Sequence, residues 1–145
     1  MLYEAPEAQQ LMAAALADLA RRYGGVGDAT PIQAEEFTPP TGDFVVAYLD
    51  EVPVACGGWR SAGDDDAELK RMFTVPAARG RGVARAVLAA LEESAHRSGR
   101  KRVILECGDR QPEAIAMYHA SGYERIANFG FYRDEPNCIS FAHPL

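Results

Sequence analysis

The stretch MFTVPAARGRGVA, residues 72–84, decides the fold. It starts in an apolar β-type segment, crosses a turn that holds two glycines, and runs into a helical pattern. Apolar side chains recur along that pattern on one helix face, up to a stop at Gly99: Val83, Val87, Leu88, Leu91 and Ala95. A strand joined to a long helix by a short glycine-rich turn indicates an α/β protein.

The turn has the composition of an anion-binding site. Gly80 and Gly82 let the backbone approach a ligand closely and adopt dihedral angles closed to other residues. The first N–H groups of the following helix have no partner within the helix, and the helix dipole adds partial positive charge there. With Arg79 and Arg81 beside them, these groups suit a pyrophosphate. The alternative is a glycine-rich connection whose arginines are merely solvated.

Two common phosphate motifs do not match this turn. A Rossmann pattern G-x-G-x-x-G/A starting at Gly80 needs a small residue where Arg85 stands, and the turn does not follow the first strand of the chain. The Walker pattern needs a Gly-Lys-Ser/Thr run, but the only lysines are Lys70 and Lys101. An anion that belongs to NAD or ATP is therefore disfavoured.

The rest of the chain alternates helical and β-type segments. The elements expected from periodicity and turn residues are a helix from Pro6 to the Gly24-Gly25 pair, strands at 44–49, 53–59 and 68–75, a helix at 82–98, a strand at 103–107, a helix at 112–120, and strands at 123–126 and 137–142. This order predicts one α/β domain over residues 1–145, with a mixed sheet flanked by helices.

The charge of the chain is distributed unevenly. The 145 residues include 15 basic and 21 acidic side chains, for a net charge of −6, and 48% are hydrophobic, as in a folded soluble protein. Residues 79–102 hold seven basic side chains against two acidic ones, so the remainder is strongly acidic. Such a chain is not expected to bind nucleic acid, because phosphate backbones need a basic footprint. The basic stretch contains the glycine-rich turn, which marks it as a functional segment.

No segment predicts membrane insertion or secretion. No apolar run approaches the roughly 20 residues that cross a bilayer, and no basic stretch opens the chain as in a signal peptide. Cys56, Cys107 and Cys138 are widely spaced and form no CxxC pair, which is typical of free thiols in a reducing compartment. We expect a cytoplasmic protein without a metal site.

Two motifs, in order along the chain, resemble the GNAT superfamily of N-acetyltransferases. The first is Arg79-x-x-Gly82-x-Ala84 after the strand that ends at 72–75, and it is similar to the acetyl-coenzyme A motif of the family. The second, PEAIAMYHASGY at residues 112–123, is similar to the family's A-x-x-x-Y helix that closes on a glycine and an aromatic residue. The resemblance covers residues 44–141, with a cofactor core at 68–123. The family usually opens with a strand before the first helix, and only Met1 to Ala5 precede it here, so that strand is expected to be short or truncated.

The resemblance implies how acetyl-CoA is bound. The sheet splays between the strands at 68–75 and 103–107 and leaves a cleft for the thioester. The backbone of Phe73 and Val75 bonds the pantetheine arm like an added strand. The pyrophosphate is held near Arg79 and by four backbone N–H groups, those of Arg81, Gly82, Val83 and Ala84.

The resemblance also implies an acetyl-CoA-dependent N-acetyltransferase in which an amine attacks the thioester directly. Tyr118 matches the family's tyrosine beside the cofactor sulfur, where a phenol that is protonated at neutral pH can donate to the departing thiolate. The alternative is a tyrosine packed in the core. Glu68 is the first candidate for the base that neutralises the amine, and Glu106 is the second. The alternative for both is an ordinary surface carboxylate.

The implied acceptor is a small molecule that carries a primary amine. By analogy with the family's substrate loops, Phe37, Trp59 and Tyr132 line its pocket. Acidic loop residues lead to the hypothesis that the acceptor is cationic, the alternative being charge that only aids solubility: Glu35, Glu36, Asp64, Asp65, Asp66, Asp134 and Glu135. Homodimers are common in the family. Two other functions stay open, a non-catalytic coenzyme-A-binding sensor and an interaction domain that binds another anion.

Overall fold

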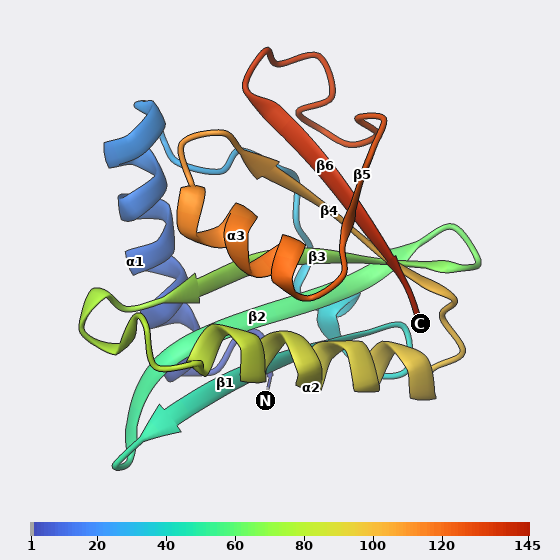
Figure 1. Cartoon of the computed structure of the whole chain (residues 1–145). Coiled ribbons are helices and arrows are strands. Elements are labelled where there is room, and N and C mark those ends of the chain that lie inside the picture. The colour runs from blue at the N-terminus through green and yellow to red at the C-terminus, as the bar shows by residue number, and fades with distance from the viewer. Residues whose placement is uncertain (1) are drawn as a thin grey trace.

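The computed structural model describes residues 2–145 of the chain (Figure 1). Its elements in chain order are α1 (Pro6–Tyr23), the short helix η1 (Ala34–Phe37), β1 (Gly42–Leu49), β2 (Val52–Ala62), β3 (Asp66–Thr74), η2 (Pro76–Ala78), α2 (Val83–Arg97), β4 (Arg102–Gly108), α3 (Pro112–Ala120), β5 (Glu124–Ile126) and β6 (Cys138–Pro144). Every helix and strand expected from the sequence is present, with ends that differ by a few residues.

The six strands form one mixed sheet in the order β1-β2-β3-β4-β6-β5. β1, β2 and β3 form an antiparallel meander, and β4, β6 and β5 form an antiparallel group. β3 and β4 join the two groups as a parallel pair, as a strand–helix–strand crossover through α2 requires. The predicted α/β fold with a mixed sheet flanked by helices is confirmed.

The helices cover opposite faces of the sheet. Side chains alternate between the two faces of a strand, and neighbouring residues of β1 and β2 belong to two different apolar clusters. One cluster packs β-strand residues such as Trp59 against Leu88 and Leu91 of α2, and includes Tyr118 of α3. The other packs Phe37 and Phe44 against α1. The sheet is therefore buried on both faces around its centre.

The N-terminal region departs from the family's usual arrangement. Residues 2–5 form no strand before α1, and Met1 lies outside the described residues. β1 consequently forms one edge of the sheet. No helix within residues 2–145 has the length and apolar character needed to cross a membrane.

Candidate active site

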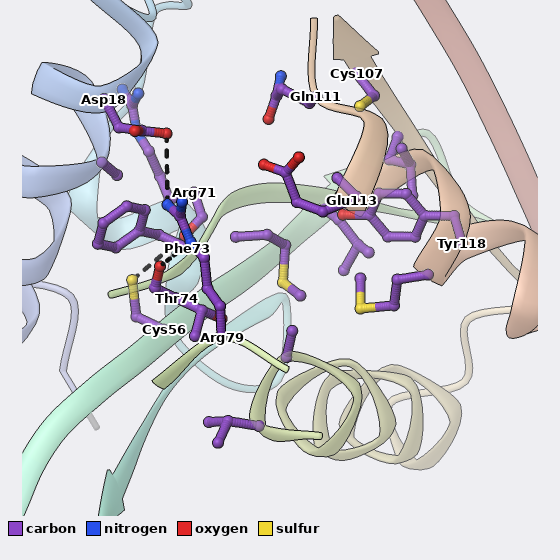
Figure 2. A pocket seen from close by; sticks show the side chains of 18 of the residues that line it. Asp18, Cys56, Arg71, Phe73, Thr74, Arg79, Cys107, Gln111, Glu113 and Tyr118 are labelled. Carbon is purple, nitrogen blue, oxygen red and sulfur yellow. Dashed lines mark hydrogen bonds and ion pairs between the residues drawn. The ribbon is translucent and has the colours of Figure 1, made fainter. Parts of the chain in front are cut away.

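The two halves of the sheet separate beside β3 and form a cleft. β3 and β4 are paired at only three positions, Asp66–Glu68 against Arg102–Ile104. Beyond these pairs β3 continues along β2 and β4 continues along β6, so the two strands diverge (Figure 1). The opening holds a cavity of about 620 Å³, lined by α1, β3, the 78–85 turn, β4 and α3 (Figure 2). The splay implied by the resemblance is present.

The backbone groups of β3 beside this cavity point in two directions. The Val75 N–H donates to the Val54 carbonyl at 2.8 Å, so β2 already occupies it. Backbone groups of an antiparallel strand point alternately toward the partner and away from it. Thr74 therefore points away from β2, and its carbonyl accepts a hydrogen bond from Arg79 Nε at 3.1 Å. Of the two residues expected to bond the pantetheine arm, Phe73 lines the cavity and Val75 does not, and Thr74 lines it between them.

The glycine-rich turn lies at one end of the cavity. Gly80 and Gly82 both have φ of 77°, the left-handed region that favours glycine, and a Cβ at either position would meet nothing within 4 Å. Gly82 is the N-cap of α2 and has no side-chain cap, so the first N–H groups of that helix are not capped by a side chain. The glycines are thus needed for the shape of the turn.

The arginines of the turn have different positions. Arg79 and Arg85 line the cavity, as do the expected residues Gly82, Val83 and Ala84. Arg85 also donates to the Ala120 carbonyl at the end of α3, at 3.0 Å. Arg81, expected near the phosphates, is exposed and does not line the cavity. The guanidinium groups of Arg79 and Arg85 and the N-terminus of α2 therefore lie at this end of the cavity.

Tyr118 lies at the opposite end of the cavity. Its ring extends from α3 into the site, where it is 4% exposed and packs near Tyr123 and Phe141 (Figure 2). Within residues 2–145 its hydroxyl makes no hydrogen bond, and it is not fully enclosed. Burial raises the pKa of this phenol above its ordinary value of 10.0, and the neighbouring Cys107 adds to the effect. The group is therefore a neutral proton donor at physiological pH.

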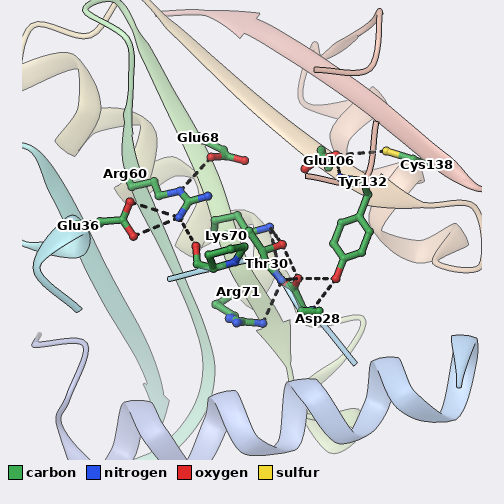
Figure 3. Close-up of polar contacts among 12 residues, drawn as sticks. Asp28, Thr30, Glu36, Arg60, Glu68, Lys70, Arg71, Glu106, Tyr132 and Cys138 are labelled. Atoms are coloured by element: carbon green, nitrogen blue, oxygen red, sulfur yellow. Dashed lines mark hydrogen bonds and ion pairs between the residues drawn. The ribbon is translucent and has the colours of Figure 1, made fainter. Parts of the chain in front are cut away.

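The two carboxylates expected to act as base have different surroundings. Glu68 lies 3.0 Å from Arg60 Nε in a buried ion pair and lines neither cavity of the site. Arg60 also contacts Glu36 and the Pro31 carbonyl, so Glu68 helps to fix the 31–36 segment on the sheet (Figure 3). The position of Glu68 does not support a catalytic role.

Glu106 lies on β4, beside the cleft, and lines both cavities. Its Oε2 accepts the Tyr132 N–H at 2.9 Å and lies 3.5 Å from Cys138 Sγ. Its Oε1 is enclosed against Gly130 and has no hydrogen-bond partner within residues 2–145. Glu106 therefore keeps an acceptor that no protein group uses.

A smaller cavity of about 280 Å³ adjoins the main one. It shares Asp28, Lys70, Glu106 and Cys107 with the larger cavity, and Tyr132, one of the residues expected around an acceptor, lines it. The expectation that Phe37 and Trp59 line an acceptor pocket is wrong. Both are at most 1% exposed. Phe37 stacks on Tyr3, and Trp59 donates to Ser94 Oγ at 3.0 Å, because the large aromatic groups fill the two cores of the sheet.

Sequence reasoning missed a charged cluster between the two cavities, made of Asp28, Lys70 and Arg71 (Figure 3). Asp28 Oδ2 lies 2.9 Å from Arg71 Nη1 and 3.5 Å from Lys70 Nζ. Burial alone would raise the pKa of Asp28, but Lys70 and hydrogen bonds from Thr30, together with Arg71, lower it to about 2. Asp28 is thus ionised at neutral pH.

Adjacent strand residues normally face opposite sides of a sheet, so no pattern in the sequence indicates that Lys70 and Arg71 contact the same carboxylate. A β-bulge brings them to one carboxylate. The β2–β3 register shifts between Cys56 and Gly58, and Arg71 has φ of 61°.

The acidic loops do not gather at the site. Of the seven loop residues that led to the hypothesis of a cationic acceptor, only Glu135 lines a cavity. Asp65 and Asp66 pair with Lys101 and Arg102 on the parallel strands' paired end, and Glu36 pairs with Arg60. Charge near the cavities comes from buried strand and loop residues instead.

Comparisons with known proteins agree with this geometry. The model of the acetyltransferase (GNAT) family matches residues 10–123. An IAA acetyltransferase of Azospirillum brasilense is 31% identical over 129 residues, which cover 83% of each protein. Among solved structures, a Klebsiella pneumoniae protein provisionally assigned as an acyl-CoA N-acyltransferase superposes with a TM-score of 0.82 and 26% identity, over 100% of this chain and 94% of that chain.

The fold also matches a GNAT family acetyltransferase of Elizabethkingia anophelis whose structure has acetyl-CoA bound. The TM-score is 0.63 and the identity 14%, over 81% of this chain and 93% of that chain. At this identity the likeness concerns the fold alone. The family match over most of the chain and the Azospirillum relative both extend across the splayed cleft, its glycine-rich turn and Tyr118. The chain therefore belongs to the GNAT family and is an N-acetyltransferase.

Proposed function

We propose that this enzyme transfers the acetyl group of acetyl-CoA to the primary amine of a small acceptor, which enters through the smaller cavity. The observation that carries the proposal is the pair of unpartnered groups beside the cleft, the Tyr118 hydroxyl and Glu106 Oε1. One can donate a proton and the other can accept one, and transfer from a thioester to an amine needs both.

The larger cavity has the groups that acetyl-CoA requires. The first N–H groups of α2 and the guanidinium groups of Arg79 and Arg85 suit the phosphates. The Thr74 carbonyl, which accepts one hydrogen bond from Arg79 Nε, keeps a second acceptor position that suits the amide-containing arm. When bound, acetyl-CoA supplies an acetyl group activated as a thioester. These residues are on elements that the two cores of the sheet hold rigidly, which favours a fixed orientation of the donor.

Glu106 is our candidate for the base. Asp28, the other buried carboxylate of the smaller cavity, is ionised but already accepts from three donors and two cations. Its low pKa also makes it a weak base. Glu106 lines both cavities, and its Oε1, enclosed against Gly130, keeps an acceptor site that no protein group uses. An ammonium acceptor must lose one proton before its nitrogen can attack, and we assign that proton to Glu106 directly or through water.

Tyr118 is our candidate for the acid. As the nitrogen–carbon bond forms and the carbon–sulfur bond breaks, its hydroxyl supplies the proton that the sulfur takes, and it regains one from the nitrogen or from solvent. An ammonium acceptor thereby becomes a neutral amide, and one proton is released overall. The raised pKa keeps Tyr118 protonated throughout the physiological pH range.

Replacement of Tyr118 by phenylalanine tests this assignment. We expect kcat to fall by about 10²–10⁴-fold, the usual worth of general acid–base catalysis, while acetyl-CoA affinity stays within threefold of wild type. Stability stays unchanged, because the hydroxyl makes no hydrogen bond to lose. The matched control is Tyr123→Phe, which removes a hydroxyl bonded to Glu92 at 2.8 Å and outside both cavities. A Tyr118→Phe enzyme with wild-type kcat would remove this residue from the mechanism.

The transfer itself is tested by release of free coenzyme A from acetyl-CoA with a panel of amines. A thermal-shift titration with acetyl-CoA runs in parallel, because a ligand at 100 times its Kd raises stability by about 2.7 kcal/mol. We expect binding and amine-dependent thiol release. Binding of acetyl-CoA without release of coenzyme A for any amine would contradict the proposed activity and favour a non-catalytic coenzyme-A sensor.

A further inference from the structure

The charged cluster beside the smaller cavity has more positive charge than its own carboxylate can pair. Lys70 and Arg71 are 7% and 9% exposed in their side chains, and both contact Asp28 alone among the acidic residues. Buried cations are costly unless each is paired and hydrogen-bonded. Two buried cations that share one buried anion leave one positive charge uncompensated at this point.

Asp28 has no capacity left for either cation. Its Oδ1 accepts the Thr30 N–H at 2.9 Å, the Thr30 hydroxyl, and the Tyr132 hydroxyl at 2.9 Å. Its Oδ2 faces both cations. A carboxylate offers about four acceptor positions, so the donors around Asp28 already fill it.

Arg71 keeps most of its donors open. Its Nη1 lies 2.9 Å from Asp28 Oδ2, but the direction of approach makes no hydrogen bond. Within residues 2–145, Nε and Nη2 have no hydrogen bond either, and they are not fully enclosed, so they meet the cavity that Arg71 lines. The bulge holds this residue at φ of 61°, which is unfavourable for an arginine. Lys70, which donates to Thr30 Oγ1 at 3.1 Å, lines both cavities.

The opposite charge lies across the same space. Glu106 lines both cavities with Lys70, and one of its oxygens has no partner. Tyr132 fixes the two ends relative to each other, because its N–H donates to Glu106 and its hydroxyl donates to Asp28 (Figure 3). The site thus has unused donors at one end and, at the other, a carboxylate of which one oxygen is enclosed and unpartnered.

We propose that the acceptor is an amino acid, whose carboxylate binds Arg71 and Lys70 while its amine lies toward Glu106. This assignment rests on the proposed acetyl transfer and names its substrate class. A carboxylate matches the planar fork of a guanidinium and supplies the missing negative charge. A purely cationic amine, such as a polyamine, leaves the two cations unpaired and adds positive charge beside them.

The test compares acceptors that differ only in the carboxylate. The twenty amino acids, their amides and their decarboxylated amines are assayed by coenzyme A release. For the best amino acid we expect kcat/KM about 100-fold above that of its amide and its decarboxylated amine, the range of a hydrogen-bonded charge. In Lys70→Met and Arg71→Gln enzymes we expect that preference to fall to within threefold, with acetyl-CoA affinity unchanged. Lys101→Met removes an exposed cation outside the site and keeps the preference.

Several outcomes would overturn the proposal. Equal kcat/KM values for the amino acid and its amide in the wild-type enzyme would show that no residue of the site binds the carboxylate. Loss of acetyl-CoA binding in the two variants would assign the cations to the donor. If no amine is acetylated, the proposed function fails. The amino acid proposal is then still decided by thermal shift in the presence of coenzyme A, where the amino acid must stabilise the protein and its amide must not.

Discussion

Replacement of Asp28 by asparagine probes the charge balance between the two cavities. The change keeps the size of the side chain and removes the negative charge that Lys70 and Arg71 share. A carboxylate whose pKa falls from 3.8 to about 2 stabilises the folded state by roughly 2–3 kcal/mol at neutral pH. Removing one partner of a buried pair costs about 3–5 kcal/mol, since the remaining charge stays buried. We therefore expect Asp28→Asn to lose roughly 2–5 kcal/mol of unfolding free energy at pH 7.

The sign of the pH dependence follows from the direction of the pKa change. A lowered pKa gives stability that is fully present above pH 4 and is lost as the pH falls toward 2. The wild-type enzyme loses this contribution over that window, whereas the asparagine variant has none to lose. The difference between the two proteins should therefore shrink as the solution is acidified.

Urea unfolding followed by tryptophan fluorescence measures this difference. The chain has a single tryptophan, Trp59, which is fully buried in the core that includes α2. Asp64→Asn is the matched control, because Asp64 is exposed and its neutralisation should change stability by less than about 0.5 kcal/mol. Equal stability of Asp28→Asn and wild type at pH 7, or a difference that stays constant down to pH 3, would refute the charge arrangement.

Three further changes test other parts of the structure. Gly82→Ala should lower the free energy of unfolding by about 1–2 kcal/mol because of its positive φ, and should also weaken acetyl-CoA binding measured by thermal shift. Gly63→Ala, at a position that also has a positive φ and open surroundings, should lower stability without changing acetyl-CoA affinity. Equal acetyl-CoA affinity of the two variants would show that the turn is not part of the binding site. Trp59→Phe should lose about 1–3 kcal/mol by circular dichroism, because Ser94 loses a buried partner; an unchanged midpoint would contradict that bond. Burial raises the pKa of the two buried thiols, Cys56 and Cys107, to about 12, so they should react with a thiol reagent at pH 8 only after unfolding. Full reaction of both in the native protein would contradict that burial.

The sequence predicted the parts of this enzyme that depend on local patterns. The glycine-rich turn was recognisable because two positive φ angles at Gly80 and Gly82 demand glycine. The helix stripes of α1 and α2 and the short apolar strand β4 follow from periodicity alone. Tyr118 was placed by its motif, and the structure brings it to the same cavity as the turn.

The rest depends on contacts between distant residues. Asp28 and Arg71 are brought into contact by a β-bulge, which the spacing of residues in the sequence does not predict. Glu68 forms an ion pair with Arg60, which lies eight residues earlier on the neighbouring strand, and therefore does not line the site. The aromatic side chains of Phe37 and Trp59 were suitable candidates for a substrate pocket, but both are buried in the two hydrophobic cores of the sheet. Whether an aromatic or charged residue faces a core or a cavity depends on the sheet register, which a single sequence specifies weakly.

Because β3 and β4 pair over only a short stretch, the sheet consists of two halves (here called panels), β1-β2-β3 and β4-β6-β5, joined by a narrow contact (here called the seam). Three residue pairs form the seam, while the panels on either side are extensively hydrogen-bonded antiparallel groups. If acetyl-CoA lies along Thr74 as proposed, it connects the two panels where β3 and β4 diverge. Its binding should then reduce the motion of one panel relative to the other. Amide hydrogens of β6, which pairs with β4 and has no residue in the lining of the larger cavity, should then exchange more slowly when coenzyme A is bound. If the donor binds as proposed, the edge of β3 that faces the cleft both holds it and couples the two halves of the sheet.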